Sequence, residues 1–400
     1  MIAYRVRWSC VGEKSALHLF WTALFAGIAI IWITQGIRAI RGMSRLPRLA
    51  EINLPSEADW PSISLIFAAR DEAEKLPGAL QTLLAQDYPH HEVVAADDRS
   101  QDSTPQILDR FARTHQRLKV VHVAELPSGW LGKPHALLRA YEQSAGDWLV
   151  FTDADVHFAP DLLHRAMALT QERGWDHLTL VGSLDLRGFW EKTATIYFGI
   201  GFTFGVEPWR VHDPRSRRYM GMGYFQLLRR SAYHAIGTHR RLAMEVVDDM
   251  KLGKLVKQGG FRSGVAMAQD RLRLRWNKGL GETVRGVTKN FFAASGYSVL
   301  RTAGNILAIL ALSVLPFLAL VVTSGLAQLL AAFTAGVGVT LYAWAARNYQ
   351  LSWLYGFTHP LGALLFCYML LRSMVVTLWR GGVVWRDTFY PLEELRKGVV

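Results

Sequence analysis

Residues 92–104 read Glu-Val-Val-Ala-Ala-Asp-Asp-Arg-Ser-Gln-Asp-Ser-Thr, and this stretch decides the fold class. Its short apolar run, rich in β-branched residues, predicts a strand that ends directly at two carboxylates, Asp97 and Asp98. Residues 149–155 repeat the arrangement, because Leu-Val-Phe-Thr leads into Asp153 and Asp155. Carboxylates that follow strands lie at the edge where open α/β sheets bind ligands.

Strand-like and helix-like segments alternate around these two stretches. The sequence predicts strands at 63–68, 93–96, 119–123 and 148–152, and helices at 74–86, 104–114 and 134–144. A Ser-Thr-Pro signal opens the second of these helices. Such alternation predicts an α/β domain with a mostly parallel sheet and crossover helices.

The composition divides the chain between a soluble part and a membrane part. Of the 400 residues, 50% are hydrophobic and 20% are charged, and the mean hydropathy is +0.12. One soluble domain of roughly 250 residues plus membrane helices fits these values. The two cysteines, Cys10 and Cys367, lie far apart, which excludes a disulfide framework and a cysteine zinc site.

The chain is basic, with a formal charge of +12. Nucleic acid is one partner that such a charge suits. However, the basic residues gather beside apolar segments, as expected next to an anionic cytoplasmic leaflet. We therefore expect a membrane partner and no nucleic acid.

Residues 17–37 form an almost uncharged stretch that is long enough to span hydrocarbon. No small-residue cleavage pattern follows it, which favours an uncleaved anchor over a signal peptide. The arginines between Arg38 and Arg48 place its C-terminal end in the cytoplasm, although Arg5, Arg7 and Lys14 on the other side weaken this assignment. Residues 193–206 are too short to span and predict either a core helix or an interfacial helix.

Three further apolar segments, at 306–322, 326–346 and 361–378, are candidate spans. Three crossings would leave the basic C-terminal tail outside, whereas its charge favours the inside, so one segment is expected to be re-entrant or to lie on the surface. Arg372, within the last segment, should face protein or an interface. We expect a membrane anchor at 1–40, a cytoplasmic domain at 41–300, and a membrane region of two to three spans with a basic tail at 301–400, in a multi-pass protein of the plasma membrane.

Five short motifs occur in a fixed order, and together they resemble one family. They are Ala69-Arg70-Asp71-Glu72, Asp97-Asp98, Gly132-Lys133, Asp153-Ala154-Asp155 and Asp248-Asp249. Over residues 60–290 the chain resembles a family 2 glycosyltransferase of the GT-A fold, a Rossmann-like domain with a mostly parallel sheet. Within that family it is most similar to membrane-anchored, non-processive enzymes that glycosylate lipids, of the hopanoid-biosynthesis-associated and ceramide-glucosyltransferase-like types.

The first two motifs suit recognition of a nucleoside. Adjacent carboxylates at a strand end can accept hydrogen bonds from a uracil N–H and a ribose hydroxyl. The resemblance implies that Asp97, Asp98 and the loop from Ala69 to Glu72 hold the nucleoside of the donor. The alternative for the two aspartates is a solvated turn or a cap of the following helix.

Asp153 and Asp155 form a D-x-D motif, which suits a metal ion and a diphosphate. Mg²⁺ or Mn²⁺ bound by carboxylate oxygens neutralises the charge of a departing diphosphate. On an extended chain, D-x-D spacing points both side chains the same way. The resemblance assigns Asp155 as the direct metal ligand. It implies that Asp153 contacts either the ribose or a group that itself binds the metal. His157 is a weaker candidate ligand, since a surface histidine suits its position as well.

Two basic residues are candidates for binding the diphosphate. Lys133 opens the helix predicted from 134, so its ammonium or the helix N-terminus could meet the phosphates; the alternative is an exposed lysine. Arg275-Trp276 matches the end of the Gln-x-x-Arg-Trp motif of processive synthases, but Leu272 stands at the Gln position. Arg275 therefore either contacts diphosphate or belongs to a basic surface strand with Arg271 and Arg273.

Asp248 and Asp249 precede a helix predicted over 250–257. Inverting transfer needs a base that takes the proton of the acceptor hydroxyl. The resemblance assigns this base to Asp249 and an orienting or acceptor-binding role to Asp248, with Glu245 as a weaker candidate. The alternative is a helix cap. Residues 221–225, Gly-Met-Gly-Tyr-Phe, form either the floor where acceptor meets donor sugar or a structural turn.

The expected function is metal-dependent, inverting transfer of one sugar from a nucleotide sugar to a lipid hydroxyl at the cytoplasmic face. The donor is expected to be a UDP-sugar, with GDP-mannose as an alternative, and the lipid class stays open. A dinucleotide-dependent oxidoreductase is excluded because the first loop, residues 67–72, has no Gly-x-Gly-x-x-Gly. A processive polysaccharide synthase and a non-catalytic, membrane-bound nucleotide-sugar-binding protein are the remaining alternatives.

Overall fold

The computed structural model describes residues 2–55, 59–275 and 279–400, and the side chains from residue 16 onward. The chain forms two compact units, here called the helical unit and the sheet unit. The helical unit comprises Met1–Arg41, Arg187–Gly205 and Ser298–Met374. The sheet unit comprises Gly42–Leu186, Val206–Tyr297 and Val375–Val400.

The sheet unit is built on one curled sheet that has eight strands among the described residues, in the order β3-β2-β1-β4-β7-β6-β8-β5. Neighbours β3, β2, β1 and β4 are parallel, as are β6 and β8, whereas β7 runs antiparallel to both β4 and β6. The mostly parallel α/β sheet expected from the sequence is therefore confirmed. The strands are β1 (Ile63–Ala69), β2 (His91–Asp98), β3 (Leu118–Val123), β4 (Trp148–Asp153), β5 (His157–Phe158), β6 (His177–Leu184), β7 (Gln226–Arg229) and β8 (Ser263–Leu274).

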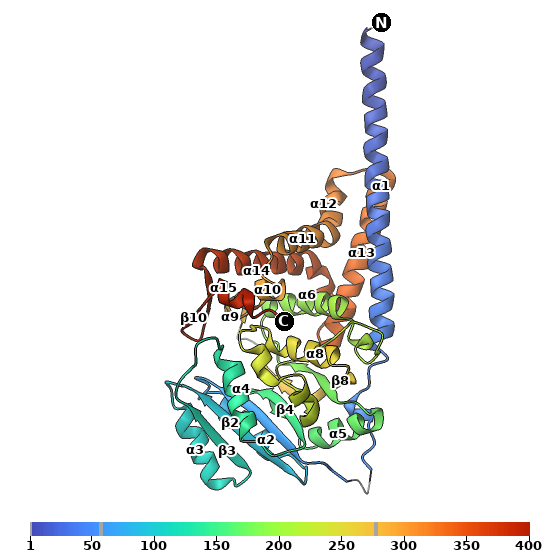
Figure 1. The fold of residues 1–400 in the computed structure, drawn as a ribbon. Coiled ribbons are helices and arrows are strands. Elements are labelled where there is room, and N and C mark those ends of the chain that lie inside the picture. The colour runs from blue at the N-terminus through green and yellow to red at the C-terminus, as the bar shows by residue number, and fades with distance from the viewer. Residues whose placement is uncertain (1, 56–58, 276–278) are drawn as a thin grey trace. The chain divides into compact units, whose positions relative to one another are not determined.

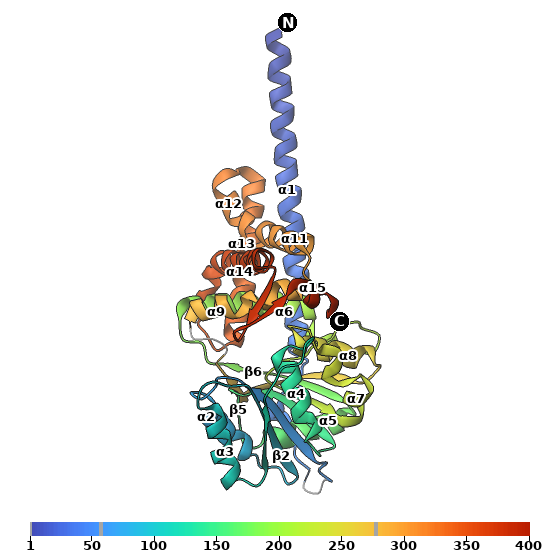
Figure 2. The same cartoon turned by 60° about the vertical axis from the view of Figure 1, so that its left-hand side comes forward.

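Helices cover both faces of this sheet. Alternate residues of each central strand point to opposite faces, so Leu65 and Phe67 of β1 join one core while Ile66 joins the other. Figure 2 shows α2 and α3 on the opposite side of the strands from α4. The helices of this unit are α2 (Leu76–Leu84), α3 (Thr104–Thr114), α4 (Gly132–Glu142), α5 (Leu162–Arg173), α7 (Arg230–Ala235), α8 (Asp248–Gln258), α9 (Gly279–Thr288), α10 (Asn290–Ala294) and α15 (Leu392–Lys397), with short 3-10 turns at Leu49–Glu51, Pro208–Arg210 and Thr238–Leu242.

The end of the chain also belongs to the sheet unit. A two-stranded hairpin joins β9 (Gly382–Trp385) to β10 (Thr388–Pro391) and leads into α15. The last residue is tied to α8, because the Val400 carbonyl accepts hydrogen bonds from Lys251 and Lys254. Glu245 accepts a bond from the Val400 N–H and pairs with Lys251, so its carboxylate anchors the C-terminus.

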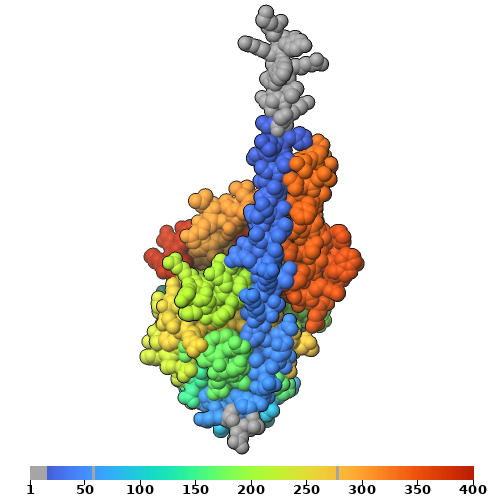
Figure 3. All heavy atoms as spheres, turned by 90° about the vertical axis from the view of Figure 1, so that its right-hand side faces the viewer, coloured from blue at the N-terminus to red at the C-terminus, as the bar shows by residue number. Residues whose placement is uncertain are grey.

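The helical unit contains long apolar helices that pack along one another. Figure 3 shows α1 (Ile2–Met43) running beside α13 (Gly325–Asn348), and the Thr334 hydroxyl donates to the Phe25 carbonyl between them. The segment 193–206 lies in α6 (Phe189–Val206), whose residues Ile196 and Tyr197 are buried in the same core, which favours the core-helix prediction. The other elements are α11 (Val299–Ile309), a π-helical turn (Leu310–Val314), α12 (Leu315–Val322), a 3-10 turn (Trp353–Thr358) and α14 (His359–Arg380).

In the part of the chain that the structure describes, four helical segments are long and apolar enough to cross a membrane. They are Ala16–Met43, Val299–Val322, Gly325–Asn348 and Trp353–Arg380. Within the last segment, α14 exposes an apolar stripe at every third or fourth residue, whereas Ala363 and Cys367 on its other side are buried. The exposed residues are Leu361, Leu364, Tyr368, Leu371, Val375 and Leu378. Arg372 is partly buried, as expected for a charged residue in such a helix.

Candidate active site

The C-terminal ends of β1, β2 and β4 bring three of the predicted motifs to one edge of the sheet (Figure 1). Ala69 of β1 is in register with Asp97 of β2, and Ala68 is in register with Asp153 of β4. Because these strands are parallel neighbours, the polar residues that end them gather at the same edge.

Asp97 and Asp98 are buried, with at most 5% of either residue exposed, so the alternative of a solvated turn is wrong. One Asp97 oxygen accepts the Ser100 N–H at 3.3 Å, and the other lies 3.4 Å from His122 Nδ1. Asp98 Oδ1 accepts from Arg99 Nε at 2.8 Å. These partners hold both carboxylates in fixed positions at the end of β2.

The loops after β1 and β2 are fastened to each other. The Asp71 carboxylate accepts the N–H groups of Gln101 and Asp102 at 2.7 and 3.3 Å, and the Ser100 hydroxyl accepts the Asp71 N–H at 3.1 Å. Asp71 itself has a φ of 55°, in the left-handed region that aspartate tolerates. Asp71 therefore fixes the shape of this loop, a role that the motif alone did not suggest.

The start of α4 lies against the end of β2. A Cβ placed on Gly132 would lie 2.3 Å from Asp98 Oδ2, so only glycine permits this approach. The next residue, Lys133, points into the site: its Nζ donates to Asp153 Oδ1 at 2.6 Å. Lys133 is therefore not the exposed surface lysine of the alternative prediction.

The two carboxylates of the D-x-D motif meet different lysines. Asp153 ends β4 and contacts Lys133, whereas Asp155 contacts Lys75, whose Nζ lies 2.8 Å from Asp155 Oδ2. The prediction that both carboxylates lie on an extended chain is wrong, because residues 154 and 155 form a turn that leads into β5. Asp153 is the last residue of β4 that pairs with β1, opposite Ala68.

The pKa values of Lys133 and Lys75 are both raised, so both side chains are protonated at neutral pH. Burial alone would lower the pKa of Lys133, but the negative charges of Asp153, Asp248 and Asp249 outweigh it and raise the pKa. Burial likewise opposes the charge of Lys75, but the hydrogen bond that Lys75 donates to Asp155 and the negative charge of Asp155 outweigh it and raise the pKa of Lys75. The D-x-D carboxylates are thus balanced by ammonium groups from two different helix N-terminal regions.

Asp248 and Asp249 lie in the first turn of α8, where Val247 is the cap residue, so Asp248 does not cap the helix as the alternative prediction held. Asp249 is fixed by two backbone donors: the Gly223 N–H reaches Oδ2 at 2.9 Å, and the Met250 N–H reaches Oδ1 at 2.7 Å. Among the described residues, no hydrogen-bond donor contacts the Asp248 carboxylate, which lines the same small hollow as Lys133 and Gly223.

The glycine stretch before β7 is the point where these groups converge. A Cβ placed on Gly223 would lie 3.1 Å from Asp153 Oδ2, 3.2 Å from Asp249 Oδ2 and 3.4 Å from Lys133 Nζ. A Cβ on Gly221 would meet the Asp249 carbonyl oxygen at 2.0 Å. The glycines therefore permit a close backbone approach, and they bring the D-x-D motif, the lysine and the second acidic pair to one place.

The environment of the second acidic pair shifts both titrations upward. Burial raises the pKa of Asp248 to about 6, with Lys133 opposing the shift and Asp249 adding to it. Burial also raises the pKa of Asp249, again opposed by Lys133. A carboxylate with a raised pKa is a better proton acceptor than an ordinary surface aspartate.

Arg275 lies just after β8, and its Nε is buried without a hydrogen-bond partner among the described residues. Trp276, the other half of the predicted pair, lies outside the described residues. Arg271 and Arg273 behave as members of a surface strand, since they pair with Asp161 and Asp270. The other loop arginine, Arg70, is partly buried 3.9 Å from Asp71.

The C-terminal hairpin reaches this edge of the sheet, which sequence reasoning did not anticipate. Arg386 forms an ion pair with Glu72, and the Tyr390 hydroxyl accepts the Gly132 N–H at 3.3 Å. The hairpin turn places Arg386 and Asp387 at φ values of 47° and 62°, which a two-residue turn of this kind requires and which glycine or asparagine would adopt more easily. No local sequence signal marks these residues as part of the site.

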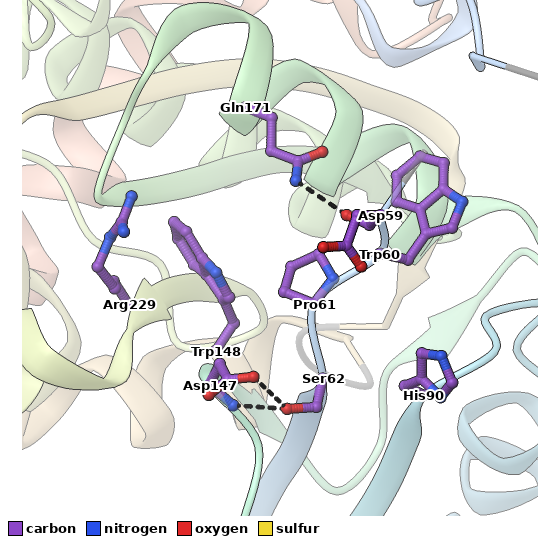
Figure 4. A pocket seen from close by; sticks show the side chains of 9 residues that line it. All are labelled: Asp59, Trp60, Pro61, Ser62, His90, Asp147, Trp148, Gln171 and Arg229. Carbon is purple, nitrogen blue, oxygen red and sulfur yellow. Dashed lines mark hydrogen bonds between the residues drawn. The ribbon is translucent and has the colours of Figure 1, made fainter. Parts of the chain in front are cut away.

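A second hollow lies at the opposite edge of the sheet, where β1 and β4 begin (Figure 4). Two of its polar residues are bonded to each other: Ser62 Oγ donates to Asp147 Oδ2 at 2.6 Å and accepts the Asp147 N–H at 2.9 Å. The Arg229 guanidinium lies 4.9 Å from the centre of the Trp148 ring. This hollow lies away from the acidic motifs.

Comparisons with known proteins agree with the geometry. The family model described as Glycosyl transferase family 2 matches residues 64–237. A beta-monoglucosyldiacylglycerol synthase from Synechocystis sp. is 33% identical over 171 residues, which are 39% of this chain and 35% of that protein. A 4,4'-diaponeurosporenoate glycosyltransferase from Staphylococcus aureus is 25% identical over 194 residues, 48% of this chain and 50% of that protein. The chain thus spans about a third to a half of the length of these curated relatives.

One solved structure has a similar fold. The mannosyltransferase PcManGT from Pyrobaculum calidifontis, in complex with GDP-Man and Mn²⁺, superposes with a TM-score of 0.51 at 18% identity, over 90% of this chain and 99% of that one. Since the identity is low, this likeness concerns the fold. Residues 64–237 therefore match the model of the family 2 glycosyl transferases, and they lie on a mostly parallel, GT-A-like sheet.

Proposed function

We propose that this protein transfers one sugar from a nucleoside diphosphate sugar to a hydroxyl group of a membrane lipid, with inversion at the anomeric carbon. The observation that carries this proposal is the convergence at Gly223, where Asp153, Lys133 and Asp249 come within a few ångström of one point. Such a reaction needs the donor diphosphate, the bond that breaks and a general base to lie close together. Lys133 suits the diphosphate, Asp153 suits its metal ion, and Asp249 suits the role of the base.

The nucleoside would bind at the ends of β1 and β2. Asp98 lies beside the start of α4, so a nucleoside held by Asp97 and Asp98 would leave its phosphates near Lys133. The loop from Ala69 to Glu72 forms the outer wall, with its shape held by Asp71. We propose a UDP-sugar as the donor, with a GDP-sugar as the alternative.

The D-x-D residues fit a divalent cation. Among the described residues, no group of three or more His, Cys, Asp and Glu side chains is arranged to hold a metal, so donor phosphate oxygens would complete the coordination. Asp155 and Asp153 offer hard carboxylate oxygens, and their ammonium partners are lysines on flexible stems. Bound there, Mg²⁺ or Mn²⁺ would neutralise negative charge on the departing diphosphate.

The acceptor step follows from the position of Asp249. The acceptor oxygen forms a bond to the anomeric carbon, and the bond from that carbon to the diphosphate oxygen breaks, so the electron pair leaves with the diphosphate. Asp249 takes the proton from the acceptor hydroxyl. The Gly223 and Met250 N–H groups hold its carboxylate in place for this transfer. One base and no covalent intermediate give inversion.

A lipid acceptor is supported by the apolar surface of the chain and by the relatives. The names of two relatives refer to a glucosyldiacylglycerol and to a diaponeurosporenoate. The exposed stripe on α14, with Leu364 and Leu371 at its centre, suits contact with acyl chains. Leu272, at the Gln position of the processive-synthase motif, is fully buried in the core, so it offers no polar group to a growing polymer.

The division of the chain restricts its membrane topology. Both the segment before Ser298 and the segment from Val375 onward belong to the sheet unit. A sheet unit that lies on one side of the membrane needs an even number of crossings between these two segments, although three candidate spans lie there. We propose that Val299–Val322 and Gly325–Asn348 cross and that α14 lies on the cytoplasmic surface with its apolar stripe in the lipid.

Cysteine labelling tests this topology. In a protein whose two native cysteines are replaced by serine, Ser324→Cys, between the two crossing helices, is expected to react with an impermeant maleimide added outside right-side-out vesicles. Lys397→Cys, in α15, is expected to react only after the vesicles are opened. Labelling of Lys397→Cys in sealed vesicles would contradict the cytoplasmic tail.

Donor binding tests the proposed function. Calorimetry on the detergent-purified protein, with a panel of UDP- and GDP-sugars with and without Mn²⁺, is expected to show metal-dependent binding of one nucleotide sugar. That sugar then goes into a transfer assay with lipid acceptors. If the folded protein bound no nucleotide sugar under any condition, the proposal would fail.

A further inference from the structure

Lys289 lies between α9 and α10 and is held by an aromatic ring rather than by a carboxylate. Its Nζ is 3.9 Å from the centre of the Trp385 ring and donates to Asn290 Oδ1 at 2.8 Å. Trp385 belongs to β9, in the same hairpin whose Arg386 and Tyr390 contact the donor edge of the sheet. A cation placed against an aromatic face is attracted by the ring quadrupole, which fixes the position of the ammonium.

The charges that act on Lys289 are those of the candidate active site. Lys133, Asp248, Asp249 and Asp153 all influence its titration. Burial and the Lys133 charge together lower the pKa of Lys289 to about 8, although the three carboxylates oppose the shift. Nevertheless, among the described residues no carboxylate lies within ion-pair distance of its ammonium, whereas Lys133 pairs directly with Asp153.

A partly desolvated ammonium without an anionic partner is costly to maintain, so its position calls for an anion supplied from outside the protein. The groups around it leave one candidate chemistry. Lys289 stacks on Trp385, whose neighbour Arg386 pairs with Glu72, and Tyr390 of the same hairpin accepts the N–H of Gly132, which precedes Lys133. The hairpin therefore links the Lys289 ammonium to the donor edge of the sheet, where a doubly charged diphosphate would lie. Phosphate oxygens accept charge-assisted hydrogen bonds from such donors.

We propose that Lys289 is a second cation for the donor diphosphate, and that Trp385 positions it. The proposal rests on the nucleotide-sugar function above. In this arrangement Lys133 and Lys289 contact phosphate oxygens, and negative charge that develops on the leaving group is met by two ammonium groups. The C-terminal hairpin is then part of the donor site, although it comes more than a hundred residues after the last acidic motif.

The test compares two ligands that differ only in their phosphates, UDP and uridine. Lys289→Met keeps the length and the apolar stem of the side chain and removes the charge. It is expected to weaken UDP binding by about tenfold to a hundredfold and to leave uridine binding unchanged. Lys289→Arg is expected to recover most of the UDP affinity. Arg285→Met, on the exposed side of α9, serves as the matched control and is expected to bind both ligands like the wild type.

Trp385 is tested through its coupling to Lys289. Trp385→Leu is expected to weaken UDP binding, Trp385→Phe to weaken it less, and the double variant Lys289→Met/Trp385→Leu to lose no more than Lys289→Met alone. Additive losses would show that Trp385 acts independently of Lys289 and would overturn the positioning role. Thermal unfolding of each variant shows whether it is folded. If Lys289→Met does not fold, the UDP and uridine affinities of Lys289→Arg are compared with those of the wild type instead.

The outcomes separate this inference from the proposed function. If the wild type bound none of the nucleoside diphosphates, the proposed function itself would fail. If the wild type bound UDP and Lys289→Met bound it equally well, only the role of Lys289 would be overturned. An equal loss of UDP and uridine affinity would also overturn it, because a purely structural effect has no preference for phosphate. A rise in the KM for a phosphorylated lipid, with UDP binding unchanged, would assign Lys289 to the acceptor instead.

Discussion

Replacing Asp249 by asparagine is expected to lower kcat by at least about 10²-fold and to leave nucleotide binding intact. The amide has the size of the carboxylate, and its oxygen can still accept the N–H of Gly223, whereas the bond from the Met250 N–H is lost. Thermal unfolding of the variant checks that it is folded. The amide cannot take a proton from an acceptor hydroxyl at neutral pH. A transfer assay with the donor chosen by calorimetry measures the loss, and calorimetry on the variant checks that the donor still binds.

Asp248→Asn is the matched control, because Asp248 is the neighbouring carboxylate in the same turn of α8. We expect a smaller loss from it, since the resemblance gives Asp248 an orienting role. If Asp248→Asn caused the larger loss and Asp249→Asn kept near-normal turnover, the base would be Asp248.

The pH profile gives a second readout on the same residues. Burial raises the pKa of both carboxyl groups, that of Asp248 to about 6, and a general base acts only when it is deprotonated. The kcat/KM of the wild type should therefore fall toward acidic pH as the Asp249 carboxylate becomes protonated, and this fall should begin above the pH at which an ordinary aspartate titrates. The residual kcat/KM of Asp249→Asn should no longer show this fall toward acidic pH.

The central strands are predictable because each one is a nearly continuous apolar run. Strands such as β1 and β4 are covered by helices on both faces, so they need apolar residues at every position rather than at alternate ones. The predicted ranges 63–68 and 148–152 agree with Ile63–Ala69 and Trp148–Asp153 to within one residue. The antiparallel strand β7, Gln226–Arg229, was not predicted, because four residues carry too little pattern and its place depends on pairing with β4.

The acidic residues of the site are predictable for a similar reason. Each follows a strand or opens a helix, so the local sequence tells where its backbone lies. The ammonium groups that balance them are not predictable, because Lys75 is 80 residues away from Asp155 in the sequence. Contacts of the C-terminal hairpin are still more distant: Arg386 lies 314 residues from Glu72. Such pairings are set by the whole fold, and no short motif records them.

Replacing Asp155 by alanine is expected to abolish most of the metal-dependent part of donor binding, by at least about tenfold in affinity. The variant removes one of two carboxylates that would hold the cation. It also removes the ion pair with Lys75, whose two side chains are 37% and 22% exposed. A pair this accessible contributes about 0–1 kcal/mol to folding, so the free energy of unfolding should change little. Calorimetry with and without Mn²⁺ measures the binding, and thermal unfolding measures the stability.

Lys75→Met separates the two losses, because it breaks the same ion pair and keeps the Asp155 carboxylate. If Asp155 is a metal ligand, Lys75→Met should retain metal-dependent binding while Asp155→Ala loses it. If the ion pair itself shaped the donor site, both variants should lose affinity to a similar extent, with or without Mn²⁺. Undiminished binding by Asp155→Ala would remove Asp155 from the donor site. Asp153 would then have to hold the cation, while the ammonium groups of Lys133 and Lys289 contact the diphosphate.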